Sequence, residues 1–310
     1  MLSIEGLSID YQVGRGRLSI LQNVNLEFPQ GKVTALIGES GSGKTTLTGS
    51  ILGLLASNAR VLSGRIMWDG KDLLEQGAEA LRRFRWRHAS VVFQAAQGAW
   101  NPTLTVGRQM LDCCLDHGVD DGPGRMEKLL KQVRLDPLRV SAAYPHQLSG
   151  GMRQRALIAM SLMLDPELII LDEPTTALDL ITQSYIFDIL ADIHTETGLT
   201  MVLVTHDLAA VARLADHVAV LYAGTVCEVA DADAMFEKPS HPYSRILLTS
   251  TPDVHGSMPD TLAGEGKPPD LRNRPAGCIF ASRCPERVEM CASVVPTLGE
   301  ERVACHLRKS

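Results

Sequence analysis

The chain has 310 residues, a formal net charge of −6 and an apolar share of 45%, a composition that suits a globular protein with more than one domain. The acidic balance argues against a non-specific nucleic-acid binder, because such proteins need excess Lys and Arg to neutralise phosphates. No apolar run approaches the ~18 residues of a membrane span, and the amino terminus lacks the pattern of a secretory signal. We therefore expect a cytosolic protein, or one that attaches to a membrane only through other proteins.

The amino-terminal part of the chain predicts short strands that lead to a glycine-rich loop. Residues 2–11 and 17–28 alternate as strands do, and 33–37 is an apolar run typical of a buried parallel strand. The loop from Gly38 to Thr45 fits the pattern G-x-x-x-x-G-K-[ST], and a helix is expected from Thr45 to about Leu55. Because the strand and the helix flank the loop as the motif requires, we interpret it as a phosphate-binding loop rather than a Gly/Ser-rich turn.

The residue types of this loop suit a nucleoside triphosphate with Mg²⁺. Glycines let the backbone wrap around phosphates, the Lys44 ammonium reaches the β- and γ-phosphates, and the Thr45 hydroxyl ligates the metal. The expected nucleotide-binding residues of this segment are Gly38, Glu39, Ser40, Gly41, Ser42, Gly43, Lys44, Thr45 and Thr46.

The middle of the chain changes from strands to helices. Residues 64–73 contain the hairpin-turn dipeptide Asp69-Gly70, and 91–93 predicts a strand that ends at Gln94. From about 95 to 158 the pattern is helical, and Ser149 is the expected N-cap of a helix over 152–164. With the N–H groups of Gly150 and Gly151, the Ser149 hydroxyl predicts a second anion site; the alternative is an ordinary capped helix.

Two carboxylates close the next buried strand, 168–171. Asp172 is the expected Mg²⁺ partner, and Glu173 is placed to polarise the attacking water. The alternative is a strand that runs into a polar turn before Pro174, but a nucleotide-bound Mg²⁺ needs such a partner. Further strands are expected at 201–204, 218–222 and 225–229.

Beyond Pro239 proline, glycine and cysteine dominate. Cys278, Cys284, Cys291 and Cys305 have the spacing C-x5-C-x6-C-x13-C, which matches neither the tight pairs of zinc sites nor common ferredoxin runs. The pattern by itself indicates four thiolates around one metal centre. The other cysteines, Cys113, Cys114 and Cys227, lie in apolar segments and are expected to be small buried side chains rather than parts of a disulfide framework.

In their order and approximate spacing, these motifs resemble those of ATP-binding cassette (ABC) ATPases over residues 1 to about 240. The segments that carry the resemblance are Gly38–Thr45, Gln94, Leu148–Met152, Leu168–Glu173, Thr176–Asp179 and His206. The resemblance implies a head-to-tail dimer in which each ATP lies between the phosphate loop of one cassette and the Ser149-Gly150-Gly151 motif of the other. A second ATPase subunit, identical or homologous, is therefore the implied partner. Met152 stands where the family often has glutamine, which leaves the backbone anion site intact.

The same resemblance implies tasks for single residues. Tyr11 matches the aromatic residue that stacks on adenine, although an ordinary hairpin aromatic is the alternative. Gln94 matches a glutamine that contacts Mg²⁺ and the attacking water, His206 a histidine that contacts the γ-phosphate, and Asp179 an aspartate at the dimer contact. Residues 95–102 match the region that receives a permease helix, where Trp100 is either an interface anchor, the preferred interpretation, or part of a helical core.

The tail has a resemblance of its own. Segments 277–280, 283–285 and 303–306, with His241-Pro242-Tyr243 upstream, are similar to the carboxyl-terminal extension of the oligopeptide/dipeptide importer ATPases. In some members four cysteines are associated with a [4Fe–4S] cluster, so the resemblance implies that Cys278, Cys284, Cys291 and Cys305 hold one. Zinc and an empty tail are the alternatives.

These inferences combine into an α/β P-loop NTPase core with an antiparallel β subdomain, an inserted helical subdomain and a small Cys-rich extension. The expected domains are 1–94 with 159–238, 95–158, and 239–310. The implied function is the ATPase subunit of a bacterial importer for peptides or related small solutes, peripheral at the cytoplasmic face of the membrane, with ATP and Mg²⁺ as cofactors. Two permease subunits and, through the complex, a periplasmic or extracellular solute-binding protein are the other implied partners, and no nucleic acid is expected. Alternatives are an importer of nickel, glutathione or oligosaccharide, a soluble non-transport ABC ATPase, a non-catalytic subunit and a simple P-loop kinase.

Overall fold

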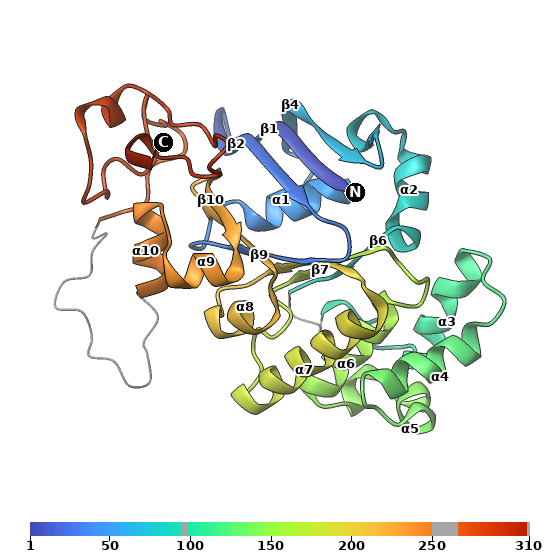
Figure 1. Ribbon diagram of the computed structural model, residues 1–310. Coiled ribbons are helices and arrows are strands. Elements are labelled where there is room, and N and C mark those ends of the chain that lie inside the picture. The colour runs from blue at the N-terminus through green and yellow to red at the C-terminus, as the bar shows by residue number, and fades with distance from the viewer. Residues whose placement is uncertain (95–97, 250–265, 309–310) are drawn as a thin grey trace. The chain divides into compact units, whose positions relative to one another are not determined.

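A computed structural model describes residues 1–94, 98–249 and 266–308. The chain divides into two compact units, which are described one at a time. The first unit comprises residues 1–29, 34–76 and 206–310, and the second comprises residues 30–33 and 77–205. Figure 1 labels most of their helices and strands.

An antiparallel sheet forms the amino-terminal part of the first unit. Its strands, in the order β2-β1-β4-β5, are β2 (Gly16–Phe28), β1 (Leu2–Val13), β4 (Ala59–Trp68) and β5 (Lys71–Asp72), and β5 leads into the short helix η1 (Leu73–Glu75). Asp69 and Gly70 connect β4 to β5 with φ angles of 46° and 79°, because a two-residue hairpin turn needs positive φ at both positions. The predicted strands 2–11 and 17–28 and the predicted turn are confirmed.

Three further strands of this unit form its buried centre. They are β3 (Val33–Ile37, of which the first unit contains Thr34 onward), β9 (His217–Tyr222) and β10 (Thr225–Asp231), with β3 parallel and β10 antiparallel to β9. The helices are α1 (Lys44–Ile51), α8 (Leu208–Leu214), α9 (Ala232–Glu237) and α10 (Pro242–Thr249), and the tail adds the short helices η4 (Glu289–Ala292) and η5 (His306–Arg308). Helix α1 ends before the predicted Leu55, since Gly53 takes a φ of 62° that ends helices.

The second unit is built on parallel strands and many helices. The strands, in the order β8-β7-β6, are β8 (Thr200–Val204), β7 (Leu168–Asp172) and β6 (Ala89–Val92). Every residue of β7 and β8 is buried, as expected of parallel strands covered on both faces. The helices are α2 (Ala78–Arg87), α3 (Val106–Asp116), α4 (Gly122–Gln132), α5 (Pro137–Ala142), the short η3 (Pro145–Gln147), α6 (Gly150–Ser161) and α7 (Leu180–Thr197).

Polar side chains begin most of these helices by accepting hydrogen bonds from the first turn. The side chains of Thr105, Asp121, Asp136, Ser149 and Asp179 each accept from a backbone N–H of the helix that follows. These caps satisfy donors that no helical carbonyl can reach. They confirm the helical character predicted for the middle of the chain, apart from residues 95–97, which lie outside the described residues.

One sequence-based preference is wrong. Trp100 was expected to be an exposed interface anchor, but its side chain is only 4% exposed and its indole N–H donates to the carbonyl of Arg153 at 3.4 Å. The indole therefore belongs to the interior of the helical region, where burying a large aromatic ring is more favourable than exposing it.

The carboxyl-terminal extension shares its apolar interior with the strands of the first unit. The ring of Phe280 packs 5.1 Å from that of Tyr222 in β9 and 5.4 Å from that of Tyr243 in α10, measured between centroids. Cys227, Cys278 and Cys291 belong to the same buried cluster. The extension is thus packed onto β9 and β10 by aromatic contacts and does not form a core of its own.

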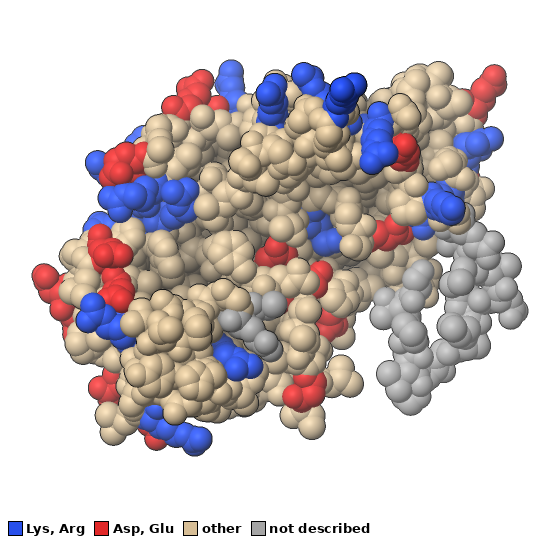
Figure 2. Space-filling model, turned by 180° about the vertical axis from the view of Figure 1, so that it is seen from behind, with Lys and Arg blue, Asp and Glu red and all other residues tan. Residues whose placement is uncertain are grey.

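Among the described residues, no helix is long and apolar enough to cross a membrane. On the face shown in Figure 2, acidic and basic side chains occur in small groups of both signs, with other residues between them.

Phe280→Ala is expected to detach the extension. Phe280 is 1% exposed, and removing a buried ring of this size typically lowers the free energy of unfolding by about 3–5 kcal/mol. Thermal unfolding and limited proteolysis of the full chain measure the change. Met290→Ala, at a side chain 53% exposed in the same extension, is the matched control and should stay within about 0.5 kcal/mol. Equal stability of the two variants would contradict the shared core.

Candidate nucleotide site

The phosphate loop surrounds a buried lysine in the first unit. The Lys44 ammonium donates to the carbonyls of Gly38 at 2.8 Å and Glu39 at 3.0 Å and lies 3.4 Å from the Ser42 hydroxyl. The residue is 8% exposed, and these oxygens compensate part of the cost of burying its positive charge. The backbone therefore holds the ammonium where the predicted β- and γ-phosphates would meet it.

Gly38 is a position where the backbone allows no side chain. Its φ is 149°, and a Cβ there would lie 2.1 Å from the carbonyl oxygen of Leu221 in β9. The loop can thus lie against β9 only because this residue is glycine. Gly43, the N-cap of α1, has a φ of 101° and places the start of that helix toward the loop.

The other predicted binding residues of the first unit differ in how far they are exposed. Tyr11 in β1 is half-buried, and its hydroxyl lies 3.4 Å from the Thr46 hydroxyl, which links the predicted adenine-stacking residue to α1. Ser40, Gly41 and Thr45 are exposed, as residues that meet a soluble ligand must be. His206 is exposed in the segment before α8.

In the second unit, the acidic strand end has a strained backbone. Asp172 is 5% exposed at the end of β7, and Glu173 follows it with a φ of 48°, which is costly for a residue with a side chain. The Glu173 N–H donates to the Val204 carbonyl at 2.8 Å, which ties this conformation to β8. The fold thus maintains an unfavourable conformation at the residue predicted to polarise water.

Two side chains orient the Glu173 carboxylate. Its Oε2 accepts from the Thr176 hydroxyl at 2.9 Å and lies 3.4 Å from Nε2 of Gln94. The structure therefore brings together Gln94 and Glu173, two residues that sequence analysis placed at one reaction centre from segments 79 positions apart. Thr176, which touches the same oxygen, was noted only as part of a motif.

Residues Ser149, Gly150 and Gly151, called the signature segment below, lie beside an exposed apolar pair. Ser149 caps α6 by accepting the Met152 N–H at 3.3 Å, and Ser149 and Gly151 line a groove together with the start of α7. Asp179 caps α7, and hydrogen bonds from Thr182 lower the pKa of the Asp179 carboxyl. Leu180 and Ile181 are 81% and 84% exposed at this groove. Sequence analysis missed this pair, although two consecutive apolar residues after an N-cap aspartate were a visible signal.

The tail cysteines gather in the extension without forming a site for a single metal ion. Cys278 and Cys291 are buried, and Cys284 and Cys305 are half-buried. Burial raises the pKa of Cys278 to about 11, and repulsion between its thiolate and those of the other three tail cysteines adds to the effect. Among the residues that the structure describes, no three His, Cys, Asp or Glu side chains come together as ligands of one metal ion. A tetrahedral zinc site, which needs its thiolates to converge on one ion, is therefore not preformed.

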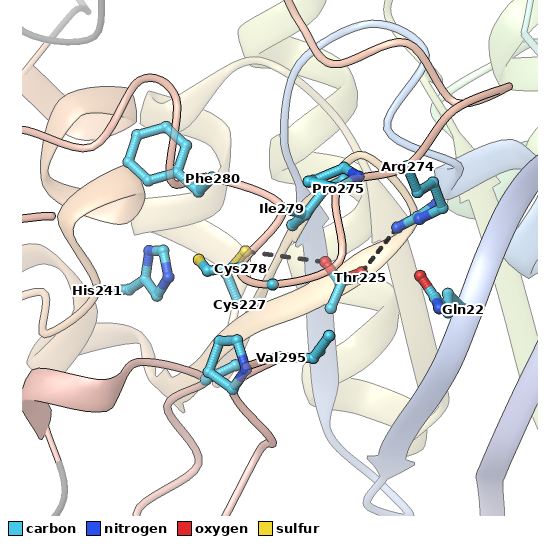
Figure 3. A pocket seen from close by; sticks show the side chains of 13 residues that line it. Gln22, Thr225, Cys227, His241, Arg274, Pro275, Cys278, Ile279, Phe280 and Val295 are labelled. Atoms are coloured by element: carbon cyan, nitrogen blue, oxygen red, sulfur yellow. Dashed lines mark hydrogen bonds between the residues drawn. The ribbon is translucent and has the colours of Figure 1, made fainter. Parts of the chain in front are cut away.

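Cys278 also lines a small cavity (Figure 3). Its volume is about 20 Å³, room for roughly one water molecule, and its lining includes Cys227, His241 and Cys278 but none of the other three tail cysteines. Burial lowers the pKa of His241 to about 4, and its Nδ1 accepts the Tyr243 N–H at 3.0 Å. The imidazole is thus neutral and structural. Cys114 and Cys227 are buried as predicted, whereas Cys113 is only half-buried.

The fold and these sites define a P-loop nucleotide-binding protein, and comparisons with known proteins define its family. The family model described as ABC transporter matches residues 21–176, and the model described as oligopeptide/dipeptide transporter, C-terminal region, matches residues 227–291. The chain therefore belongs to the ABC transporter ATPases, with the extension of the oligopeptide/dipeptide branch.

Curated relatives match along nearly the whole chain. The dipeptide transport ATP-binding protein DppD of Caldanaerobacter subterraneus is 41% identical over 99% of this chain and 97% of the relative. DppD of Bacillus subtilis is 39% identical over 96% of this chain and 90% of the relative. A putative peptide import ATP-binding protein of Brucella ovis is 38% identical over 97% of this chain and 95% of the relative.

Solved structures confirm the cassette fold. A dimeric ATP-binding cassette in a post-hydrolysis state with ADP and Pi has a TM-score of 0.66 and 28% identity, and the match covers 75% of this chain and 99% of that one. The cassette cbiO1 of Clostridium perfringens, part of an ABC transporter complex, has a TM-score of 0.65 and 28% identity, over 77% of this chain and 91% of that one. The predicted fold class is thus confirmed for the cassette.

Gly38→Ala should weaken Mg–ATP binding by more than about tenfold, because the added methyl group forces the loop away from β9. Equilibrium binding of labelled ATP to the full chain measures it. The control is Gly77→Ala, where φ is −68° and no atom lies within 4 Å of the new methyl group. Wild-type affinity in Gly38→Ala would show that the close approach of loop and strand does not matter for binding.

Proposed function

We propose that this chain is the ATP-hydrolysing subunit of a bacterial ABC importer that takes up peptides or related small solutes. The observation that carries the proposal is the match to dipeptide transport ATP-binding proteins over nearly the whole chain, extension included. Importers of nickel, glutathione or oligosaccharide and a soluble non-transport ABC ATPase are the alternatives from the sequence. No observation in the structure favours any of them.

The proposed mechanism takes the role of each residue from the family resemblance. Lys44 and the loop N–H groups would bind the β- and γ-phosphates, and the resemblance gives Thr45, Gln94 and Asp172 as the residues that would hold the Mg²⁺ used with ATP. Glu173 takes a proton from the attacking water, and His206 contacts the γ-phosphate. Glu173 is supported in this role by its two hydrogen-bonding neighbours and its strained backbone, since such strain concentrates at functional positions.

A second ATPase subunit completes each site in this proposal. Ser149, Gly150 and Gly151 would face the ATP held by the other subunit, and Asp179 would lie at the contact. Support comes from the exposed pair Leu180 and Ile181 beside the signature groove, because adjacent apolar side chains this exposed favour burial against a partner. ATP binding then closes the dimer, and hydrolysis reopens it.

The remaining partners follow from the family. Two permease subunits would cross the membrane, with this chain peripheral at its cytoplasmic face, and a solute-binding protein would deliver the cargo. The division into a core of 1–94 with 159–238, a helical subdomain of 95–158 and an extension of 239–310 is likewise a proposal. Residues 95–97 of the proposed permease contact lie outside the described residues.

Glu173→Gln in the complex with its permeases should bind ATP but hydrolyse it at least about 100-fold more slowly, because the amide cannot take up the proton. Phosphate release and retained nucleotide are the two readouts. The matched control is Glu167→Gln, an exposed carboxylate just before β7 that pairs with His88. Unchanged turnover in Glu173→Gln would exclude Glu173 as the base.

We also propose, from the resemblance, that Cys278, Cys284, Cys291 and Cys305 hold a [4Fe–4S] cluster, which would supply a structural or redox centre. The extension supplies the four cysteines that this donor set needs, and Cys291 and Cys305 help to raise the pKa of both Cys278 and Cys284. In such a cluster each iron takes one thiolate, so the thiolates need not converge on a single ion. Zinc, which binds its thiolates on one ion, is the alternative.

Protein purified without oxygen should then carry iron and acid-labile sulfide and absorb broadly near ~400 nm, as thiolate–iron centres do. Cys284→Ser should lose most of the iron, whereas Cys113→Ser, outside the extension, should keep it. A colourless, iron-free protein that binds ATP normally would rule out the cluster and leave a tail that folds without metal.

A further inference from the structure

The extension reaches the phosphate loop through one ion pair. The Arg283 guanidinium donates from both terminal nitrogens to the Glu39 carboxylate, at 2.9 and 3.0 Å, and also to the Tyr222 hydroxyl at 3.1 Å. The Arg283 side chain is 10% exposed and that of Glu39 is 32% exposed, so water screens the pair only partly. Two-pronged pairs of this kind are stronger and more directional than single contacts.

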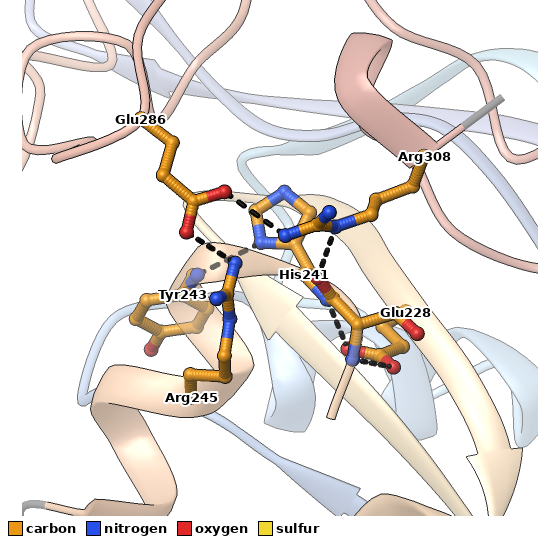
Figure 4. Close-up of polar contacts among 7 residues, drawn as sticks. Glu228, His241, Tyr243, Arg245, Glu286 and Arg308 are labelled. Atoms are coloured by element: carbon orange, nitrogen blue, oxygen red, sulfur yellow. Dashed lines mark hydrogen bonds and ion pairs between the residues drawn. The ribbon is translucent and has the colours of Figure 1, made fainter. Parts of the chain in front are cut away.

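A second contact fixes the backbone of the same residue. The Glu39 N–H donates to the Tyr243 hydroxyl at 3.0 Å. Figure 4 shows what holds Tyr243 there: Glu228 accepts the N–H groups of Ser240 and His241, and His241 accepts the N–H of Tyr243. The start of α10 is thus fixed by a buried carboxylate, and the loop residue is held from both its main chain and its side chain.

Ion pairs within the extension stabilise the region around these contacts. Glu286 pairs with Arg245 of α10 at 2.5 Å and with Arg308 at 2.9 Å, and Arg308 donates to the Ser240 carbonyl. The turn that carries Arg283 is closed by its N–H, which donates to the carbonyl of the buried Phe280 at 3.0 Å. These contacts hold the segment that carries Arg283, and they thereby fix the position of its side chain next to Glu39.

Glu39 places an acidic side chain inside the phosphate loop. It lies inside the anion-binding loop, and its own carbonyl accepts from the Lys44 ammonium. An ionised carboxylate there would repel a triphosphate that the loop exists to attract. Arg283 is the cation that contacts this carboxylate directly.

We propose that Arg283 of the carboxyl-terminal extension is a positioning residue for ATP binding: its guanidinium neutralises Glu39 in the phosphate loop, and the extension thereby sets the nucleotide affinity of the cassette. The proposal rests on the assignment of residues 38–45 as the phosphate loop. It gives the extension a task at the ATP site, independent of whether the tail holds a metal.

The test is a charge cycle on the full chain, with the dissociation constant of Mg–ATP as readout. Arg283→Gln should weaken binding roughly fivefold to tenfold, the size expected from one uncompensated charge several ångströms from the phosphates. Glu39→Gln should bind Mg–ATP more tightly than wild type, because it removes the repelling carboxylate and leaves the Arg283 cation beside the loop. The double variant Glu39→Gln/Arg283→Gln should return to within about twofold of wild type, because the net charge beside the loop is then the same as in the wild type although the ion pair is missing.

Added salt and conservative variants separate charge from structure. The deficit of Arg283→Gln should shrink as ionic strength rises, and Arg283→Lys should keep most of the affinity. Arg287→Gln, at an exposed arginine of the same segment, should match wild type. A double variant as weak as Arg283→Gln, or an Arg283→Gln with wild-type affinity, would overturn the proposal.

Lys44→Ala distinguishes the failure of this inference from the failure of the site assignment. If Lys44→Ala binds Mg–ATP normally, residues 38–45 are not the phosphate loop, and both the site assignment and the role proposed for Arg283 are wrong. If Lys44→Ala loses binding while the charge cycle shows no rescue, the site stands and the task given to Arg283 is wrong. Steady-state kinetics of the full complex should show the effect of Arg283→Gln mainly in KM for ATP.

Discussion

A buried ammonium that needs oxygen partners organises the first unit. Lys44 has to be withdrawn from water to meet a triphosphate, and a withdrawn charge is tolerable only when oxygens surround it. The loop supplies its own carbonyls for this purpose. Several other features serve the shape of that loop: glycine at Gly38 lets it approach β9, and Tyr243 holds its main chain. The geometry of the loop is thus imposed from the strands behind it and the extension beside it.

In the second unit, the corresponding feature is a strained backbone at the predicted catalytic residue rather than a buried charge. The left-handed backbone of Glu173 is unfavourable by itself, and it persists because β7 ends there and its N–H is committed to β8. Thr176 and Gln94 then orient the carboxylate. The first unit thus carries the phosphate loop with its lysine, and the second unit carries the carboxylates of Asp172 and Glu173.

Much of this could be predicted from the sequence, because local patterns determine it. Apolar runs such as 33–37 and 168–171 became buried strands, and Ser149 became an N-cap, since periodicity and capping are short-range signals. Trp100 was misjudged because burial depends on helices that arrive from elsewhere in the chain. Arg283 and Glu39 are 244 positions apart in the sequence, and no pattern in either local segment predicts their contact. Long-range ion pairs of this kind become visible only once the fold is known.

The aromatic contacts of Tyr222, Tyr243 and Phe280 also constrain how such a protein can change over evolutionary time. A gene shortened to residues 1–238 would leave the Tyr222 ring and its apolar neighbours on β9 and β10 facing solvent, and the product would tend to aggregate. Loss of the extension therefore requires that apolar side chains on β9 and β10 be replaced by polar ones, either beforehand or at the same time. The cassette and the extension therefore have to evolve together, and neither can be exchanged freely between transporters.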